Sequence, residues 1–292
     1  MSTPAPVVVA VGPTGADAAL EYAAREAVLL DAPVHVVHVL QVPASTAIAA
    51  GVYGDLAAEA RSILDKAVER ARDLVDGRVP VTGEHIDEPG SIAKKLAEAA
   101  GRGSQMVLEH RHLSRAYRLF SGSTVNGVAA RASVPVVTVP EGWQPDAQAV
   151  RVTAAIQEVE GAGPILREAY TLAHRHGAPL TVLHAWWLDS GYDLIAVDDD
   201  YREERAREFQ SELAPVTKVL RSEFPDVELS VEVVHAPPSE ALLDAAARSR
   251  LLVIGRRHHL LPLGTHLGPI ARAVVDRSEC PVVVAPEAGA TS

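Results

Sequence analysis

Two short stretches decide the fold, SVPVVTVPE at residues 133–141 and ECPVVVAPE at residues 279–287. Each is a Val-rich apolar run behind a proline, which is typical of a buried strand. The two prolines, Pro135 and Pro281, are separated by 281 − 135 = 146 residues. One of these stretches lies near the end of each half of the chain.

A second pair of stretches has the same separation. APVHVVHVL at residues 32–40 and APLTVLHAW at residues 178–186 place His38 and His184 at equivalent points, and 184 − 38 is again 146. Two distant landmarks that share one offset indicate an internal duplication. The joint falls in GWQPDAQAV, where glycine, proline and polar residues interrupt the pattern. We therefore expect two repeated domains, residues 1–142 and 148–292.

Each half alternates short β-branched runs with longer helical stretches, the pattern of a parallel sheet with helices on both faces. The fold class is therefore α/β, with two repeated doubly wound domains, each a five-stranded parallel sheet flanked by helices. Ligands in such sheets bind outside the carboxyl ends of the strands, where the strand order reverses. The expected strands are 6–12, 34–40, 80–86, 105–109 and 135–139, then 150–157, 179–186, 227–234, 250–254 and 281–285.

Composition excludes several classes of function. The chain has 292 residues, 48% of them hydrophobic, and a net charge of −11, which disfavours a general grip on nucleic acid or on an anionic membrane. Its single cysteine, Cys280, excludes a disulfide within the chain and a four-thiolate zinc site. The start has no basic region and no apolar run is long enough to span a bilayer, so we expect a soluble cytoplasmic protein.

The loop after the fourth strand is the main candidate for a binding site. In the second half, LLVIG is followed by a basic loop and then by Gly268, which is expected to open a helix. In the first half, Gly122, Ser123 and Thr124 are expected to open the corresponding helix. The first N–H groups of a helix have no partner within it, and with the helix dipole they favour an anion.

With this layout the chain resembles the universal stress protein family, as a tandem two-domain member. The resemblance covers both halves and includes the strand order, the CPVVVAP and VPVVTVP endings, the strand-two histidines and the LHAWW segment around His184. It implies an adenine nucleotide alpha hydrolase-like fold. For the members that bind ATP, it also implies a G-x2-G-x9-G-[ST] pattern after strand four and an aspartate at the end of strand one.

Neither half keeps that pattern intact. In the second half Gly255 and Gly268 stand at the first and third glycine positions, but the second is His258 and the hydroxyl residue is replaced by Pro269. Arg256 keeps the loop basic, so this half retains features that favour an anion. The second half is therefore the more favourable place for ATP.

The first half departs further. Gly122 and Ser123 are retained, but Glu109 and His112 occupy the two earlier glycine positions. A carboxylate about 4 Å from a phosphate charge costs roughly 1–4 kcal/mol, depending on the local dielectric. Glu109 therefore weakens this site.

The strand-one aspartate is also missing from both halves. The matching positions are Val11 or Gly12 in the first half, and Gln157 or Glu158 in the second. None of these is an aspartate, although Gln157 keeps a polar side chain. The resemblance therefore implies degenerate nucleotide sites.

The remaining candidate metal-binding and catalytic residues are better explained by structural roles. The histidines of the two strand-four loops have no cysteine or carboxylate at regular ligand spacing, so we expect no metal site. His38 and His184 are expected to be hydrogen-bonded core residues. Asp198, Asp199 and Asp200 precede a charged helix and favour its dipole. Cys280 lies before a buried strand and is not expected to be catalytic, and Ser91 and Ser239 are expected to be helix caps.

The expected function is non-enzymatic. We expect a stress-response protein with degenerate nucleotide sites that acts by ligand sensing or protein interaction. The alternative is an ATP-binding member, with slow hydrolysis. A nucleotidyl-transferring enzyme would need a phosphate signature after strand one, which VGPTGAD and IQEVEGAG do not supply.

The expected partners follow from the same reasoning. We expect the two halves to pair through their last strands, because open apolar edges promote aggregation and soluble proteins cover them. A small anionic ligand fits the basic loop, and the composition leaves homodimerisation of whole chains open. Nucleic acid and membranes are not expected partners.

Overall fold

The computed structural model describes residues 4–40, 50–87, 90–110, 118–188, 197–256 and 267–286. The chain divides into two compact units. The first comprises residues up to Gln144, and the second runs from Pro145 to Arg257 and resumes at Gly268. Each unit is described by itself below.

The two units have matching successions of strands and helices. The elements of the first unit are β1 (Val7–Ala10), α1 (Asp17–Leu30), β2 (Val34–Val39), α2 (Ala50–Val75), β3 (Val81–Ile86), α3 (Ile92–Ala100), β4 (Gln105–His110), α4 (Arg118–Ala129) and β5 (Val136–Pro140). Those of the second unit are β6 (Arg151–Ala155), α5 (Gly163–His176), β7 (Leu180–Trp186), α7 (Asp199–Glu223), β8 (Leu229–His235), α8 (Pro238–Ala246), β9 (Ser249–Ile254), α9 (Pro269–Arg277) and β10 (Val282–Val284).

Both sheets have the same strand order. Parallel pairings give β3-β2-β1-β4-β5 in the first unit and β8-β7-β6-β9-β10 in the second. The expected doubly wound α/β fold, with a five-stranded parallel sheet in each half, is therefore confirmed. The order reverses between β1 and β4, and between β6 and β9.

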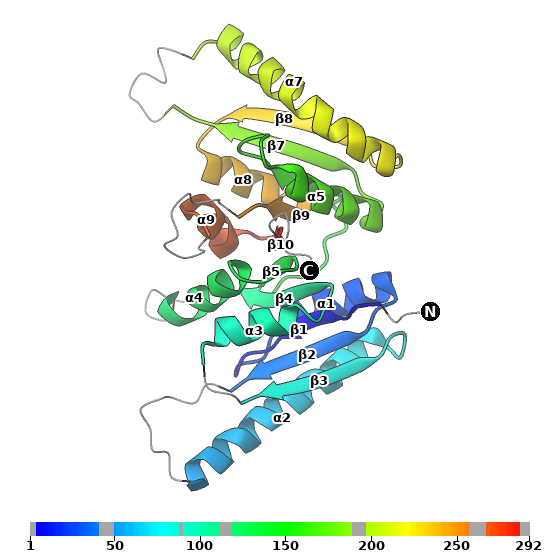
Figure 1. Ribbon diagram of the computed structural model, residues 1–292, viewed down its shortest axis with the longest axis vertical. Helices are drawn as coiled ribbons and strands as arrows, with labels where there is room; N and C mark the ends of the chain where they lie inside the picture. Colours follow the sequence, from blue (N-terminus) through cyan, green and yellow to red (C-terminus); the bar gives the residue numbers. More distant parts are fainter. Residues whose placement is uncertain are drawn as a thin grey trace. The chain divides into compact units, whose positions relative to one another are not determined.

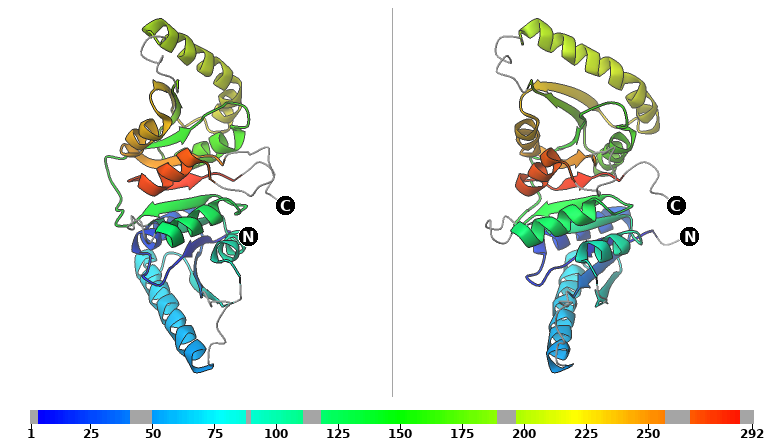
Figure 2. Two further views of the ribbon diagram at one scale, coloured as in Figure 1. Left: turned by 90° about the vertical axis from the view of Figure 1, so that its left-hand side faces the viewer. Right: turned by 60° about the vertical axis from the view of Figure 1, so that its left-hand side comes forward.

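Helices cover both faces of each sheet (Figure 1). In the first unit α1 packs beside α2 on one face, and α3 beside α4 on the other. In the second unit α5 packs beside α7, and α8 beside α9. The two further views show the same layers, with the strands of each unit between helices (Figure 2). Strands covered on both faces must be apolar along their whole length.

The cores have this aliphatic character. In the first unit Val7, Val8 and Val9 of β1 are completely buried, and in the second Leu252 and Val253 of β9 are as well. The Val-rich runs of the sequence therefore form the central strands. The repeat extends to the turn that follows the first helix of each unit, where Asp31 and Gly177 are both left-handed C-caps, with φ of 50° and 56°.

The register of the strands shows where the repeat is interrupted. Val34 of β2 corresponds to Leu180 of β7, at an offset of 180 − 34 = 146. Their partners in the first strands, Val7 and Val152, differ by 152 − 7 = 145. The first strand of the second unit is therefore displaced by one residue from the 146-residue repeat.

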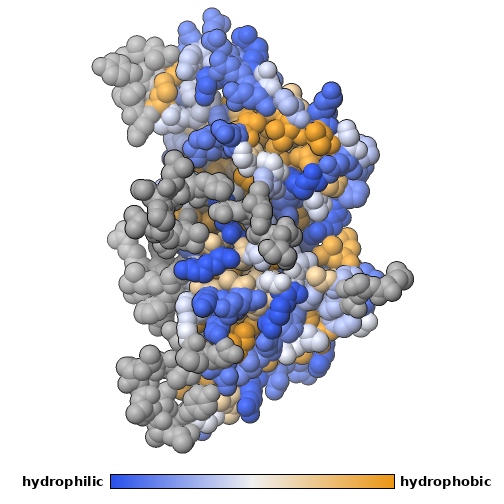
Figure 3. Space-filling model, viewed as in Figure 1, coloured by the Kyte–Doolittle hydropathy of each residue, from blue (hydrophilic) through white to orange (hydrophobic). Residues whose placement is uncertain are grey.

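Hydrophilic and hydrophobic side chains are unevenly distributed on the face drawn in Figure 3. On the face drawn in Figure 3, hydrophilic side chains cover most of the coloured surface, with smaller hydrophobic patches between them. Among the described residues, every helix is too short or too polar to cross a lipid bilayer.

Candidate functional site

The crevice where the strand order reverses is the expected ligand position in a doubly wound sheet. In the first unit it lies at the carboxyl ends of β1 and β4, and in the second at those of β6 and β9. The helix that follows the first strand, α1 or α5, begins at the same edge. Its N–H groups are therefore available to whatever occupies the crevice.

In the first unit this position holds a side chain of the protein itself. Glu109 lies near the end of β4, and its Oε2 accepts hydrogen bonds from the backbone N–H groups of Ala18 at 2.9 Å and Ala19 at 3.4 Å. These are first-turn amides of α1, whose N-cap residue, Ala16, makes no side-chain capping bond. Glu109 therefore caps α1 from a position 91 residues away in the sequence.

The carboxylate satisfies two requirements of the helix end at once. It accepts N–H groups that have no acceptor within α1, and its negative charge is favourable at the positive end of the helix dipole. From the sequence alone, Glu109 is expected only to repel a bound phosphate. The structure gives it an attractive contact that no sequence pattern indicated.

The second unit has no side chain at the corresponding position. Gly255 follows β9 and lies 255 − 109 = 146 residues after Glu109. A Cβ atom added to Gly255 would lie 2.3 Å from Cδ1 and 3.0 Å from Cγ1 of Ile165, on α5. The absence of a side chain at Gly255 therefore serves a close packing contact within the protein. The N-cap of α5, Ala162, makes no side-chain capping bond.

Two buried histidines identify the end of strand one in each unit. His38 is 4% exposed and its Nδ1–H donates to the carbonyl oxygen of Val11 at 2.9 Å. His184 is 8% exposed and makes the same bond to Ile156 at 3.0 Å. Val11 therefore matches Ile156, and the following pair is Gly12 and Gln157. The expectation of hydrogen-bonded core histidines is confirmed.

The surroundings of the two histidines favour their neutral forms. Burial lowers the pKa of both, and it outweighs the opposite effect of the backbone hydrogen bonds. His85 further lowers the pKa of His38. Near His184, Arg205 lowers the pKa and Glu212 raises it. With Nδ1 donating to a carbonyl, the second proton would go to Nε2.

The residues at the strand-one end do not supply an acid at the matched positions. Gly12 has no side chain, and Gln157 is exposed to solvent. Glu158 lies one residue further along the loop and is exposed too. Because β6 is displaced by one residue, the 146-residue offset pairs Val11 with Gln157, whereas the structure pairs Gly12 with Gln157.

The helix after strand four differs from its expected position in the first unit. α4 begins at Arg118, so Gly122, Ser123 and Thr124 lie within the helix instead of opening it. The expectation is wrong by about one turn. The unpaired N–H groups of an α-helix are the first four, which here belong to residues 118–121.

In the second unit Gly268 is the extended N-cap of α9, with φ −60° and ψ 163°, and Pro269 is in the first turn. The backbone N–H of Arg272 donates to the Gly268 carbonyl at 2.9 Å, which closes that turn. Arg256 is half-buried directly after Gly255. His258 lies outside the described residues, as do His112, His259 and His266.

The other motifs have structural roles. Asp198 is the N-cap of α7, and its Oδ1 accepts the N–H of Tyr201 at 2.9 Å, which confirms the helix-start interpretation of the Asp run. Ser91 is the N-cap of α3 but makes no side-chain bond. The Ser239 prediction is wrong, because Pro237 is the N-cap of α8. Burial raises the pKa of Cys280 to about 11, so its thiol stays protonated.

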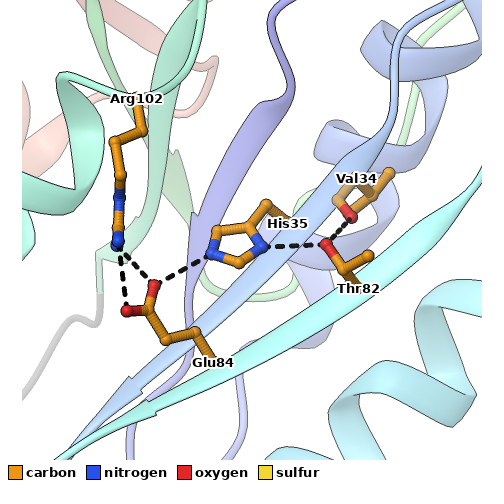
Figure 4. A network of polar contacts seen from close by, with 5 residues as sticks. All are labelled: Val34, His35, Thr82, Glu84 and Arg102. Carbon is orange, nitrogen blue, oxygen red and sulfur yellow. Dashed lines mark hydrogen bonds and ion pairs between the residues drawn. The ribbon is translucent and has the colours of Figure 1, made fainter.

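One polar network in the first unit was not anticipated from the sequence (Figure 4). Glu84 of β3 contacts Arg102 and accepts from His35 Nε2 at 3.1 Å, and His35 Nδ1 lies 2.9 Å from Thr82 Oγ1. Partial burial opposes ionisation of Glu84, but its bonds with Arg102 and His35 outweigh burial and lower its pKa. The network ties the turn after α3 to the edge strand.

A shallow hollow of about 240 Å³ adjoins this network. Its charged lining residues come from β3, α3 and the turns that follow them and carry both signs, and Lys95 lies 3.9 Å from Glu98. The mixed charge is largely compensated within the protein, so the hollow does not define a ligand. Across the described residues no group of three His, Cys, Asp or Glu side chains could hold a metal ion.

The repeated sheets, with a crevice at each reversal of strand order, define a tandem doubly wound α/β protein of the adenine nucleotide alpha hydrolase-like type. The family model of the universal stress protein family matches residues 5–140 and again residues 150–286. The chain therefore belongs to the universal stress protein family, with one family domain in each half.

Individual relatives agree with this assignment. A universal stress protein of Mycolicibacterium smegmatis is 29% identical over 275 residues, which cover 92% of both chains. One from Mycobacterium tuberculosis is 27% identical over 290 residues, which cover 96% of both. The crystal structure of a universal stress protein from Archaeoglobus fulgidus matches 96% of both chains, with a TM-score of 0.67 and 17% identity, and this likeness supports the fold.

Proposed function

We propose that this protein is a non-enzymatic, cytoplasmic stress-response protein whose two nucleotide sites are degenerate. It acts by sensing a small ligand or by contacting other proteins. The observation that carries the proposal is the Glu109 carboxylate on the first-turn amides of α1. A negative group already occupies the crevice where a nucleotide would bring its own negative charge.

Two further features support the proposal. In the second unit α9 starts with Pro269, where the pattern of the ATP-binding members has a hydroxyl residue. At the end of strand one, Gly12 and Gln157 replace the acid that ATP-binding members carry. Each difference removes a ligand contact, and together they affect both units.

The alternative is an ATP-binding protein with slow hydrolysis, and one observation favours it. Gly268 is an extended N-cap without a side-chain capping bond among the described residues, and the segment that precedes it in the sequence is basic. If ATP binds, the second unit is therefore the expected place.

Thermal unfolding of the full chain with and without Mg-ATP separates the two proposals. A ligand present at a thousand times its dissociation constant stabilises the folded state by about 4 kcal/mol. We expect millimolar ATP to leave the melting temperature nearly unchanged. A rise of many degrees that Gly268→Val abolishes and Gly122→Val retains would instead establish the ATP-binding alternative.

A further inference from the structure

Aromatic side chains gather at one place in the second unit, although aromatic residues make up only 4% of the chain. Trp186 ends β7 and Trp187 follows it, while His235 ends β8. The His235 ring lies 4.3 Å from the Trp186 ring and is stacked on the Trp187 ring at 5.0 Å, with an angle of 18° between the planes. Tyr201 of α7 packs edge-on against Trp186 at 5.7 Å.

One ring of this cluster is buried and two are exposed to solvent. Trp186 is 8% exposed, whereas Trp187 is 43% exposed and Tyr201 is 38% exposed. In the first unit Leu40 stands at the position of Trp186, since 186 − 40 = 146. The fold therefore does not require aromatic residues here. The exposed rings lie after β7 and in the first turn of α7, outside the pair of strands, β6 and β9, where the strand order reverses.

The charges around the cluster determine which ligand fits. Residues 198–205 contain five acidic and two basic side chains, a net charge of 2 − 5 = −3. The two arginines are already engaged, Arg202 with Asp199 at 2.8 Å and Arg205 with Glu208 at 3.0 Å. The surplus at the start of α7 is therefore negative, and it repels anions such as phosphates.

The protein itself places a cation on this cluster. The Arg205 guanidinium carbon lies 5.9 Å from the centre of the Trp186 ring, within cation–π distance. Tyr201 lies within the acidic start of α7 and against Trp186, and Trp187 is stacked on His235, which also contacts Trp186; both exposed rings therefore border the same buried ring. Aromatic faces are a recognised means of binding quaternary ammonium ions.

We propose that Trp187, Tyr201 and the acidic start of α7 form a binding site for a small organic cation of the quaternary ammonium class. The site belongs to the second unit alone and is independent of the anion chemistry of the strand-four loops. A quaternary ammonium ion suits it because its positive charge is spread over apolar methyl groups, which contact aromatic rings without a large loss of hydration.

Ligand-observed saturation-transfer NMR with the full chain tests this proposal, with choline chloride as the probe. Choline should give a saturable transfer signal in the millimolar range. Its neutral isostere, 3,3-dimethyl-1-butanol, should give a much weaker signal, because it has the same shape without the charge. Equal signals from the two compounds would overturn the proposal, and so would the absence of any choline signal.

Variants locate the site. Trp187→Ala should abolish the choline signal, and Tyr201→Ala should weaken binding several-fold, while Tyr201→Phe should keep it because the ring is retained. Trp143→Phe is the matched control in the first unit. Asp200→Asn with Glu204→Gln should also weaken binding several-fold. An unchanged signal in folded Trp187→Ala, verified by circular dichroism, would contradict the assignment.

Discussion

Glu109→Ala is expected to lower the free energy of unfolding by about 1–2 kcal/mol, because two first-turn amides of α1 lose the carboxylate that accepts their hydrogen bonds and the helix dipole loses a negative partner. The amides of Ala18 and Ala19 make these contacts in the wild-type protein. Urea unfolding followed by circular dichroism measures the change. Glu109→Gln is the matched variant, since it keeps an acceptor oxygen and loses only the charge.

Glu109→Gln should therefore cost less than Glu109→Ala, within about 1 kcal/mol of the wild type. Removing the charge also removes its repulsion of phosphate. We accordingly expect millimolar phosphate or ATP to stabilise Glu109→Ala more than it stabilises the wild-type protein. If Glu109→Ala were as stable as the wild type and equally indifferent to phosphate, the carboxylate would have no role at this helix end.

His184→Leu is expected to cost about 1–3 kcal/mol, because the buried carbonyl of Ile156 would lose its hydrogen-bond donor. His184→Asn places an amide N–H close to the position of Nδ1, so it should retain much of this stability. Both variants lose the stacking of His184 on Phe209 at 4.2 Å. The difference between the two variants therefore reports the hydrogen bond, and equal stability would argue against it.

The same histidines predict a pH dependence. Burial lowers the pKa of His38 and His184 below 6.5 in the folded protein. As pH falls below 6.5, the unfolded chain takes up these protons before the folded chain does, so the unfolded state is favoured. Stability should therefore decrease as the pH falls from 7.5 to 5. Glu84 has a lowered pKa and loses its contribution only at lower pH, below its ordinary value of 4.5.

Melting temperatures across this pH range check the prediction. The double variant His38→Asn with His184→Asn should lose less stability between pH 7.5 and pH 5 than the wild type loses. An unchanged pH dependence in the folded double variant would contradict the assignment of the effect to His38 and His184.

The sequence predicted the fold because periodicity and repetition carry that information. Val-rich runs behind Pro135 and Pro281 are buried on both faces, and only a parallel sheet covered by helices buries them in that way. The matching histidines of strand two and the capping role of Asp198 also followed from local chemistry. These features depend on neighbours along the chain or on the repeat itself.

The candidate site was less predictable. The sequence predicts a start of α4 about one turn too late, because the Gly-Ser-Thr run has the composition of a cap but lies within the helix. The 146-residue offset also misaligns the ends of the first strands, because β6 is displaced by one residue relative to β7. The stack of His235 on Trp187 joins the end of β8 to the residue after β7, and these come together only because Trp186 and His235 pair in the folded sheet.

By itself the sequence determined the duplication, the strand order expected of its family and the loss of the nucleotide motif, because these are properties of residue identity and spacing. Only the tertiary structure decided what replaces the lost contacts. Glu109 reaches α1 because β4 lies beside β1 in the sheet, and Gly255 accommodates Ile165 for the same topological reason. Contacts between residues far apart in the chain depend on which strands are neighbours in the sheet. The packing of the folded protein fixes this strand order.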